Sequence, residues 1–283
     1  MVGSIVWLAS YMKSGNTWLR LLLANLLSDS PEPVNINDIR LSPLSVTGRA
    51  DFEELTLIDN SLLTLTELDA LRPFMIASIA DKLESVAYIK LHEAYRRTAN
   101  GEPLLGRSHA RAALYVMRDP RDVAVSLAFH SGISLNEAID QMNRPDWSTG
   151  TKAWRYSMQL PLVQLDWSSH VESWIDQDDV PVHVMRYEDM RADTVAALSA
   201  AADFLNLDVS LKKIAHAVRC ADFCRLQQQE REVGFCERPP VRGEAAPFFR
   251  SGRAGGWREV LTTKQEHAIS EAHTRVMARF GYF

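Results

Sequence analysis

Cysteine is scarce in this chain of 283 residues, which contains only Cys220, Cys224 and Cys236. An odd number of cysteines without a Cys-x-x-Cys pair provides neither a disulfide framework nor a zinc pattern, and it is typical of a reducing compartment. The eight histidines form no ligand-like cluster with the cysteines or with carboxylates. The sequence therefore predicts a protein that needs no metal.

Long apolar runs are also missing. The densest one, Leu19 to Leu27, is far shorter than the roughly 20 residues that cross a bilayer. The first basic residue, Lys13, follows the first apolar run instead of preceding it, which is not typical of a signal peptide. These absences predict a soluble, cytoplasmic protein without a membrane partner.

An excess of positive charge is absent as well, because the formal net charge is −5. A nucleic-acid-binding surface is usually basic over a whole face, so this charge argues against a nucleic-acid partner. The basic residues are instead local, with five arginines and one glutamate between Arg238 and Arg258. An anionic ligand would explain this concentration, and a solvated loop is the alternative.

Linkers and internal repeats are not found, and 46% of the residues are hydrophobic, which is ample for a buried core. We therefore expect one domain over residues 1–283. Short apolar runs begin near Ile5, Val86, Leu114 and Val182, and helical stretches separate them. This alternation predicts a three-layer α/β/α fold, similar to the P-loop folds, with a central parallel sheet of four or five strands.

The first apolar run leads into a loop with a lysine, a glycine and two hydroxyls, and then into an apolar helical segment. Backbone N–H groups and a helix N-terminus after a strand are suited to an anion. No carboxylate precedes Asp29, so an anion meets no local negative charge. The order Lys13-Ser14-Gly15 differs from the Gly-Lys-Ser/Thr of a Walker A nucleotide site. A tight turn with a solvated lysine is the alternative.

At this loop the sequence resembles the first signature of the sulfotransferases that use 3′-phosphoadenosine-5′-phosphosulfate (PAPS), in particular their soluble, cytosolic-type and bacterial-like members. That signature is Tyr-Pro-Lys-Ser-Gly-Thr-Thr-Trp, and this chain departs from it at Met12 and Asn16. The resemblance implies that the 5′-phosphosulfate is bound by Lys13, Ser14, Gly15, Asn16, Thr17 and Trp18.

A second apolar run ends in Lys90 and His92, which share one face of an extended chain. Lys90-Leu91-His92 resembles the Lys-Thr-His of the same family, which implies that His92 is the catalytic base and that Lys90 holds the sulfuryl group. Taken alone, His92 has a structural or solvated histidine as its alternative.

A third apolar run precedes Arg118, and Asp119 and Pro120 predict the start of a helix, with Asp122 placed favourably near its positive end. The segment resembles the family's Arg-x-Pro-x-Asp-x-x-x-Ser. This implies that Arg118 and Ser126 hold the 3′-phosphate. A capped helix with a surface arginine is the alternative.

A Gly- and Arg-rich loop follows near the end of the chain, and guanidinium groups and bare backbone amides suit a phosphate. It resembles the family's Arg-Lys-Gly-x-x-Gly-x-Trp, which implies a 3′-phosphate contact through Arg250, Ser251 and Gly252. Ser251 stands where the family usually has lysine. We therefore expect weaker cofactor affinity or compensation by Arg253.

The likeness further implies that Trp18, Tyr187 and Phe223 bracket the adenine by stacking, although core packing is an equal alternative for Phe223. His170 and Trp174 fall in another family-like segment, and we expect them to pack a helix instead of touching substrate.

The resemblance implies transfer of a sulfuryl group from PAPS to a hydroxyl of a small molecule, a phenol or an alcohol, with release of adenosine 3′,5′-bisphosphate (PAP). Lys13 would contact the bridging oxygen and His92 would deprotonate the acceptor. The acceptor stays open, amines included, because residues 31–79 and 132–165 match no motif. The second of these segments contains Trp147, Trp154, Tyr156 and Met158.

The oligomeric state and two other functions stay open. A homodimer is possible, because the segment after Trp257 partly resembles the family's dimer segment. A kinase-like, nucleotide-dependent phosphotransferase would share the strand, loop and helix, but no convincing Walker B-type acidic strand end is found. A catalytically silent nucleotide-binding module is the other function, and the presence of both Lys90 and His92 argues against it.

Overall fold

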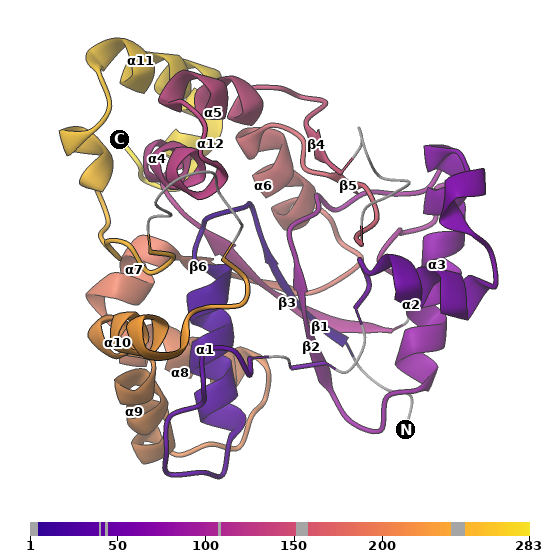
Figure 1. Ribbon diagram of the computed structural model, residues 1–283, viewed down its shortest axis with the longest axis horizontal. Helices are drawn as coiled ribbons and strands as arrows, with labels where there is room; N and C mark the ends of the chain where they lie inside the picture. The colour runs from indigo at the N-terminus through magenta and orange to yellow at the C-terminus, as the bar shows by residue number, and fades with distance from the viewer. Residues whose placement is uncertain (1–4, 40, 43–44, 107–108, 151–157, 239–246) are drawn as a thin grey trace. The chain divides into compact units, whose positions relative to one another are not determined.

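The computed structural model describes residues 5–39, 41–42, 45–106, 109–150, 158–238 and 247–283. Its central sheet has four parallel strands in the order β2-β1-β3-β6 (Figure 1). These strands are β1 (Ile5–Ser10), β2 (Ala87–Leu91), β3 (Ala110–Met117) and β6 (Val182–Arg186). All four coincide with the apolar runs that the sequence predicts to be strands. The α/β class and the central parallel sheet are thus confirmed, consistent with a three-layer α/β/α fold.

Strand β1 leads into the loop that resembles a phosphate site. All six of its residues are buried, which explains its nearly uninterrupted apolar composition, because a parallel strand is usually covered on both faces. It pairs in parallel with β2 from Ile5 opposite Ala87 to Ala9 opposite Leu91. This register brings the next two residues, Ser10 and His92, to the same edge of the sheet.

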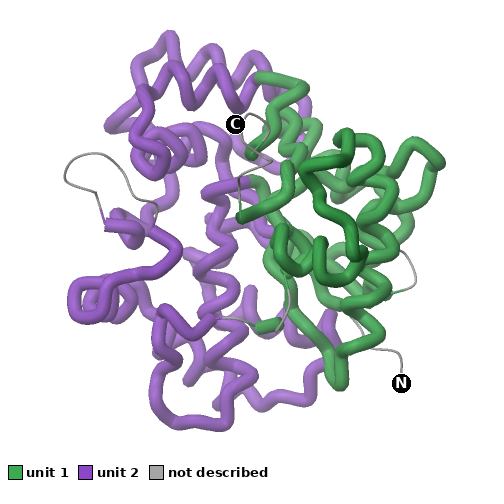
Figure 2. Tube along the Cα trace, turned by 45° about the vertical axis from the view of Figure 1, so that its right-hand side comes forward, with its two compact units in different colours: residues 1–11, 41–115, 144–184 green, residues 12–40, 116–143, 185–283 purple. Residues whose placement is uncertain are grey.

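The chain divides into two compact units (Figure 2). Unit 1 comprises residues 1–11, 41–115 and 144–184, and unit 2 comprises residues 12–40, 116–143 and 185–283. The division follows β1 directly and passes within β3 and β6. The expectation of one domain over residues 1–283 stays a prediction.

Unit 1 contains strands β1 and β2, most of β3 and β6, and several helices. Its other elements are α2 (Arg49–Thr56), η1 (Asn60–Leu62), α3 (Leu65–Asp81), β4 (Ser148–Thr149), β5 (Leu162–Val163) and α6 (Trp167–Ile175). Asp166 caps α6, because its carboxylate accepts a hydrogen bond from the Ser169 N–H at 2.9 Å. The cap fixes where α6 begins and thereby the phase of its buried face.

Unit 2 is mostly helical. Its elements are α1 (Asn16–Leu27), α4 (Pro120–Ser131), α5 (Leu135–Met142), α7 (Tyr187–Ala192), α8 (Thr194–Phe204), α9 (Leu211–Cys220), α10 (Phe223–Val233), η3 (Gly256–Glu259), α11 (Thr263–Ala272) and α12 (Thr274–Arg279). Helix α4 begins where the sequence predicts: the Asp119 side chain caps it by accepting from the Arg121 N–H at 2.9 Å, and Pro120 is its first residue. Among the described residues, no helix combines the length and the apolar character that a bilayer crossing requires.

Candidate active site

In unit 1, His92 lies at the end of β2 and its ring is held by β1. The Nδ1 atom of His92 lies 3.0 Å from the carbonyl oxygen of Ser10 and 3.1 Å from the Ser10 hydroxyl oxygen. Ser10 is fully buried, whereas His92 is partly exposed. The Nδ1 edge of the His92 ring is therefore held by Ser10.

Helix α6 holds the main chain at the same strand end. His170 Nε2 lies 3.2 Å from the carbonyl oxygen of His92, and Trp174 Nε1 donates to the carbonyl oxygen of Glu93 at 2.9 Å. Both side chains are fully buried, in agreement with the structural role expected of them. The sequence did not indicate that His170 contacts the main chain of the residue predicted to be the base, or that Trp174 contacts the residue after it.

A buried ionic cluster follows His92 directly. The Glu93 carboxylate is fully buried and forms ion pairs with Arg72 at 2.7 Å and with Arg96 at 2.9 Å. Arg96 also pairs with Asp69 at 2.9 Å, so two guanidinium groups and two carboxylates balance each other. Removing one member would leave an uncompensated buried charge, so the four side chains are expected to stay together. Because Glu93 and Arg96 belong to the segment after β2, the cluster holds that segment in place.

In unit 2, the loop from Lys13 to Gly15 ends at an uncapped helix. Gly15 precedes α1 with φ +114°, no side chain caps the helix, and its first turn has no acidic residue. A Cβ atom on Gly15 would lie 2.7 Å from the ring of Tyr187, so both the backbone conformation and the contact require glycine. The Ser14 hydroxyl is buried without a hydrogen-bond partner among the described residues. These groups fit an anion that accepts hydrogen bonds from the loop and from the helix start.

Lys13 adopts a positive φ of 66°, which is uncommon for a residue with a side chain. Its ammonium nitrogen lies 4.3 Å from the centre of the Phe248 ring, a cation–π contact. Its carbonyl oxygen accepts a long hydrogen bond from Arg118 at 3.5 Å. Phe248 is thus a contact of the predicted catalytic lysine that the sequence did not indicate.

Arg118 lies among several predicted cofactor residues. Its guanidinium lies 4.4 Å from the centre of the Tyr187 ring and donates to the carbonyl oxygen of Arg253 at 2.7 Å. Partial burial, and next the positive charge of Arg118, lower the pKa of Arg250. The positive charges of Arg118 and Arg250 repel each other, and an anion bound between them would reduce this repulsion.

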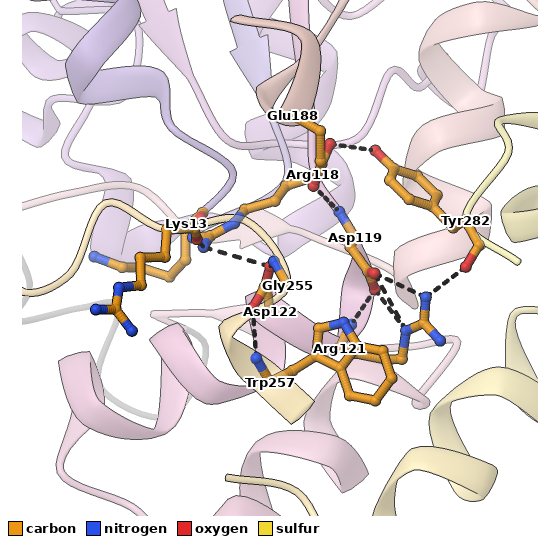
Figure 3. Close-up of polar contacts among 10 residues, drawn as sticks. Lys13, Arg118, Asp119, Arg121, Asp122, Glu188, Gly255, Trp257 and Tyr282 are labelled. Carbon is orange, nitrogen blue, oxygen red and sulfur yellow. Dashed lines mark hydrogen bonds and ion pairs between the residues drawn. The ribbon is translucent and has the colours of Figure 1, made fainter. Parts of the chain in front are cut away.

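Asp122 fastens the Gly-rich loop to the start of α4. Its carboxylate accepts hydrogen bonds from the N–H groups of Gly255 at 2.6 Å and Trp257 at 2.9 Å, and it lies 3.7 Å from the Arg118 guanidinium (Figure 3). Burial raises the pKa of Asp122, and Arg118 and the two N–H donors oppose the rise. The sequence placed Asp122 only near the positive helix end and missed this long-range role.

The capping residues of α4 are tied to the last residues of the chain (Figure 3). Asp119 pairs with Arg121, whose guanidinium stacks 4.1 Å from the centre of the Trp257 ring and donates to the carbonyl oxygen of Tyr282. Glu188 accepts from the Asp119 N–H at 3.0 Å and from the Tyr282 hydroxyl at 3.1 Å. Glu188 is thereby engaged in structural contacts.

The aromatic residues predicted to bracket adenine lie in two groups. Trp18 and Tyr187 form an edge-to-face pair with ring centres 5.7 Å apart. Phe223 begins α10, and a Cβ atom on Gly252 would lie 2.7 Å from the Phe223 ring. Each group places aromatic rings directly against a glycine-containing loop of unit 2.

The remaining predicted site residues have fewer described contacts. The Thr17 hydroxyl accepts from Arg20 at 3.3 Å, Asn16 is buried, Ser126 is half-buried on α4, and Ser251 is exposed. Lys90 is half-buried at the end of β2. No group of three or more His, Cys, Asp or Glu side chains that could hold a metal ion occurs in the part of the chain that the structure describes.

The aromatic residues suggested for the acceptor segment differ in burial. Trp147 is buried and its ring centre lies 5.7 Å from that of Tyr11, whereas Met158 is largely exposed. Trp154 and Tyr156 lie outside the described residues. Packing therefore accounts for Trp147 without a ligand.

His170 gives unit 1 a defined response to acid. Burial lowers the pKa of His170 to about 3, so the folded protein keeps this ring neutral where the unfolded chain, with the ordinary pKa of 6.5, takes up a proton. Between these values the unfolded state binds more protons, and the free energy of unfolding falls by about 1.4 kcal/mol for each pH unit of acidification. We expect the His170→Gln variant to lack this contribution. Urea unfolding at pH 7 and pH 4.5 should show wild type losing about 2–3 kcal/mol more than the variant; equal losses would contradict the neutral buried ring.

Comparison with known proteins agrees with the motifs and the fold. The chain matches the family model described as the sulfotransferase domain over residues 4–281. It is 25% identical over 263 residues to the luciferin sulfotransferase of Photinus pyralis, covering 90% of this chain and 66% of that protein. It is 24% identical over 169 residues to Sulfotransferase 2A2 of Mus musculus, covering 59% of this chain and 57% of that protein. The alignments thus span less than two thirds of the length of these two relatives.

A solved structure shares the fold. Mouse sulfotransferase SULT7A1, whose crystal structure is a complex with PAP, superposes with a TM-score of 0.59 at 21% identity, covering 97% of this chain and 85% of that one. Because the family model matches nearly the whole chain, the protein belongs to the sulfotransferase domain family.

Proposed function

We propose that the protein is a PAPS-dependent sulfotransferase that acts on a small-molecule hydroxyl. The observation that carries the proposal is a cationic pair beside the loop: the Arg118 guanidinium donates to the carbonyl oxygens of Lys13 at 3.5 Å and Arg253 at 2.7 Å, and its charge lowers the pKa of Arg250. A nucleotide with a 3′-phosphate needs such a second cationic site, whereas ATP and ADP do not have that phosphate. This favours PAPS over the nucleotide of a kinase-like enzyme.

The cofactor residues divide according to the group that they bind. The loop Lys13–Trp18 and the first turn of α1 hold the 5′-phosphosulfate through N–H groups, Lys13 and the Ser14 hydroxyl. The 3′-phosphate is held by Arg118, Ser126, Arg250, Ser251 and Gly252. The adenine stacks on Trp18, Tyr187 and Phe223. The Ser14 hydroxyl, which has no hydrogen-bond partner in the described part of the chain, and the glycine at position 15 fit this assignment.

Bound PAPS would supply the sulfuryl group, and three side chains would handle charge and protons. Lys13 stabilises the negative charge on the bridging oxygen, Lys90 stabilises the sulfuryl oxygens, and His92 removes the acceptor proton. A histidine suits this step because its ordinary pKa leaves the ring largely neutral at pH 7. The proposed chemistry uses lysine charge and requires no metal.

The acceptor class rests on similarity alone. The relative from Photinus pyralis is named for luciferin, a small molecule, and the motifs place no acceptor residue beyond His92. We propose a phenol or an alcohol as the acceptor. An amine would be distinguished from a hydroxyl by the bond formed in the product.

The test is transfer of radioactive sulfate from labelled PAPS to a panel of phenols, alcohols and amines, with γ-labelled ATP as the parallel donor. We expect labelled product from PAPS only, formed on a hydroxyl. Transfer from ATP would establish the kinase-like reading. Binding of PAPS without transfer to any acceptor in the panel would favour the silent nucleotide-binding module.

Asp122 is expected to support the 3′-phosphate site by holding the Gly255–Trp257 loop. Replacing Asp122 by asparagine removes the charge that binds two N–H donors, and hydrogen bonds to a charged group contribute about 1.5–3 kcal/mol. We therefore expect PAP affinity to fall by roughly tenfold to a hundredfold in a calorimetric titration. Asp140→Asn makes the same change at an exposed position of α5 and should bind as wild type does. Equal affinity in the two variants would reject the anchoring role.

Arg253 is proposed to compensate for the missing lysine at Ser251. Its side chain is exposed and lies 3.7 Å from Glu259, while its carbonyl oxygen receives the Arg118 hydrogen bond. Arg253→Ala keeps that carbonyl, so any change in PAP affinity reports on the guanidinium alone. We expect weaker binding in Arg253→Ala and tighter binding in Glu259→Ala, which frees the guanidinium from its carboxylate. Unchanged affinity in Arg253→Ala would end the compensation hypothesis.

A further inference from the structure

His92 is held at two points by groups of unit 1. Its ring meets the carbonyl oxygen of Ser10 at 3.0 Å, and its own carbonyl oxygen meets His170 at 3.2 Å. Ser10 and His170 are both fully buried. His92, which is partly exposed, is therefore held by two residues of the buried interior.

The contact with Ser10 decides which ring nitrogen carries the proton. A backbone carbonyl oxygen can only accept a hydrogen bond, so Nδ1 of His92 must donate. In a neutral imidazole the other nitrogen, Nε2, is then the unprotonated one. The Ser10 hydroxyl, 3.1 Å from the same nitrogen, offers a second acceptor on the same side.

The contact with His170 applies the same reasoning to the main chain. The carbonyl oxygen of His92 accepts from Nε2 of His170, so Nδ1 of His170 is the acceptor and receives the Tyr115 hydroxyl hydrogen at 2.8 Å. Burial lowers the pKa of His170 to about 3 and raises that of Tyr115 well above its ordinary value. Both groups stay neutral near pH 7, so the direction of these hydrogen bonds does not change there.

We infer that Ser10 and His170 are positioning residues that fix the tautomer and the orientation of His92, leaving its Nε2 atom as the base nitrogen. This inference rests on the proposed function for its catalytic meaning. In the transfer step the acceptor O–H bond breaks and its proton binds Nε2, the acceptor oxygen bonds to sulfur, and the bridging S–O bond breaks to release PAP. The Ser10 carbonyl oxygen, already bound to the Nδ1 proton, then stabilises the resulting imidazolium.

The direct test is a long-range ¹H–¹⁵N correlation spectrum of the ¹⁵N-labelled protein, recorded at a pH where the spectrum shows a neutral His92 ring. The His92 signals are assigned by their loss in His92→Gln. We expect the pattern of a ring with the proton on Nδ1. A proton on Nε2 would overturn the inference. This measurement needs no sulfotransferase activity, so a protein with the expected tautomer but no transfer from PAPS would refute the proposed function alone.

Variants of His170 test the main-chain contact. His170→Phe removes the donor to the His92 carbonyl, and a misplaced catalytic group can cost up to about 100-fold in rate. We expect kcat to fall while KM for PAPS stays near that of wild type. His170→Gln keeps an N–H donor and should restore most of kcat. A kcat of His170→Phe equal to that of wild type, or no recovery in His170→Gln, would contradict the positioning role.

Ser10 supplies a second pair of variants if His170→Phe does not fold. Ser10→Ala keeps the carbonyl oxygen and removes one of the two acceptors of the ring, a loss worth roughly twofold to tenfold in kcat. Ser10→Thr keeps the hydroxyl and should remain close to wild type. Equal kcat values for Ser10→Ala and wild type would show that the Ser10 hydroxyl does not help to position His92. A changed His92 tautomer in Ser10→Ala, which keeps the carbonyl oxygen, would contradict the assignment of the tautomer to that oxygen.

Discussion

Replacing His92 by alanine is expected to lower turnover by roughly 100- to 10,000-fold, the usual effect of losing a general base. The ring of His92 contacts Ser10 and partly faces solvent, so alanine removes a partly exposed side chain. Affinity for PAP should therefore stay close to that of wild type, because the residues assigned to the cofactor belong to unit 2 and His92 to unit 1.

The loss is measured as kcat with labelled PAPS, and PAP binding is measured by calorimetry on the same preparation. His267→Ala removes a histidine whose side chain is 77% exposed, and it should leave both quantities unchanged. Turnover of His92→Ala within a few-fold of the His267→Ala control would show that another group takes the acceptor proton.

Replacing Lys13 by methionine is expected to lower kcat by roughly 100- to 1,000-fold, because one preorganised donor to developing charge has about this effect. Methionine has a similar length and also packs well against an aromatic ring, so the contact with Phe248 is kept in kind. The change therefore removes the charge with little change in packing.

Lys264→Met makes the same substitution at an exposed position of α11 and serves as the matched control. The expected result is a large fall in kcat together with a smaller loss of PAP affinity. PAP has no sulfuryl group, so no negative charge develops on a bridging oxygen when it binds. A loss of PAP affinity as large as the loss in kcat would make Lys13 a binding residue without a specific part in the transfer.

Local chemistry explains what the sequence predicted well. The four strands are short, mostly apolar runs with a polar residue at the end or directly after it in β2, β3 and β6, and β1 is buried along its whole length. The start of α4 follows from Asp119 and Pro120, which act within two residues of each other. Gly15 was expected in the phosphate loop, and the ring of Tyr187 at 2.7 Å from its missing Cβ gives the steric reason.

Contacts between distant parts of the chain explain what the sequence did not predict. Asp122 holds Gly255 across 133 residues, and Arg20 donates to both carboxylate oxygens of Glu237, 217 residues away, at 2.8 and 2.6 Å. Periodicity and capping rules act over a few residues, so such partners appear only once the chain is folded. The division into two units could not be predicted for the same reason, because each unit is assembled from three segments that are separate in the sequence.

The proposed sulfotransferase activity requires that the protein bind a nucleotide with both a 5′- and a 3′-phosphate. Calorimetric titration with PAP, in parallel with ADP and ATP and without added metal, tests this most directly. We predict tight binding of PAP and little or no binding of ADP or ATP, because among the three only PAP carries the 3′-phosphate that we propose Arg118 and Arg250 to bind. Preference for ATP, or no binding of PAP, would contradict the proposed sulfotransferase activity.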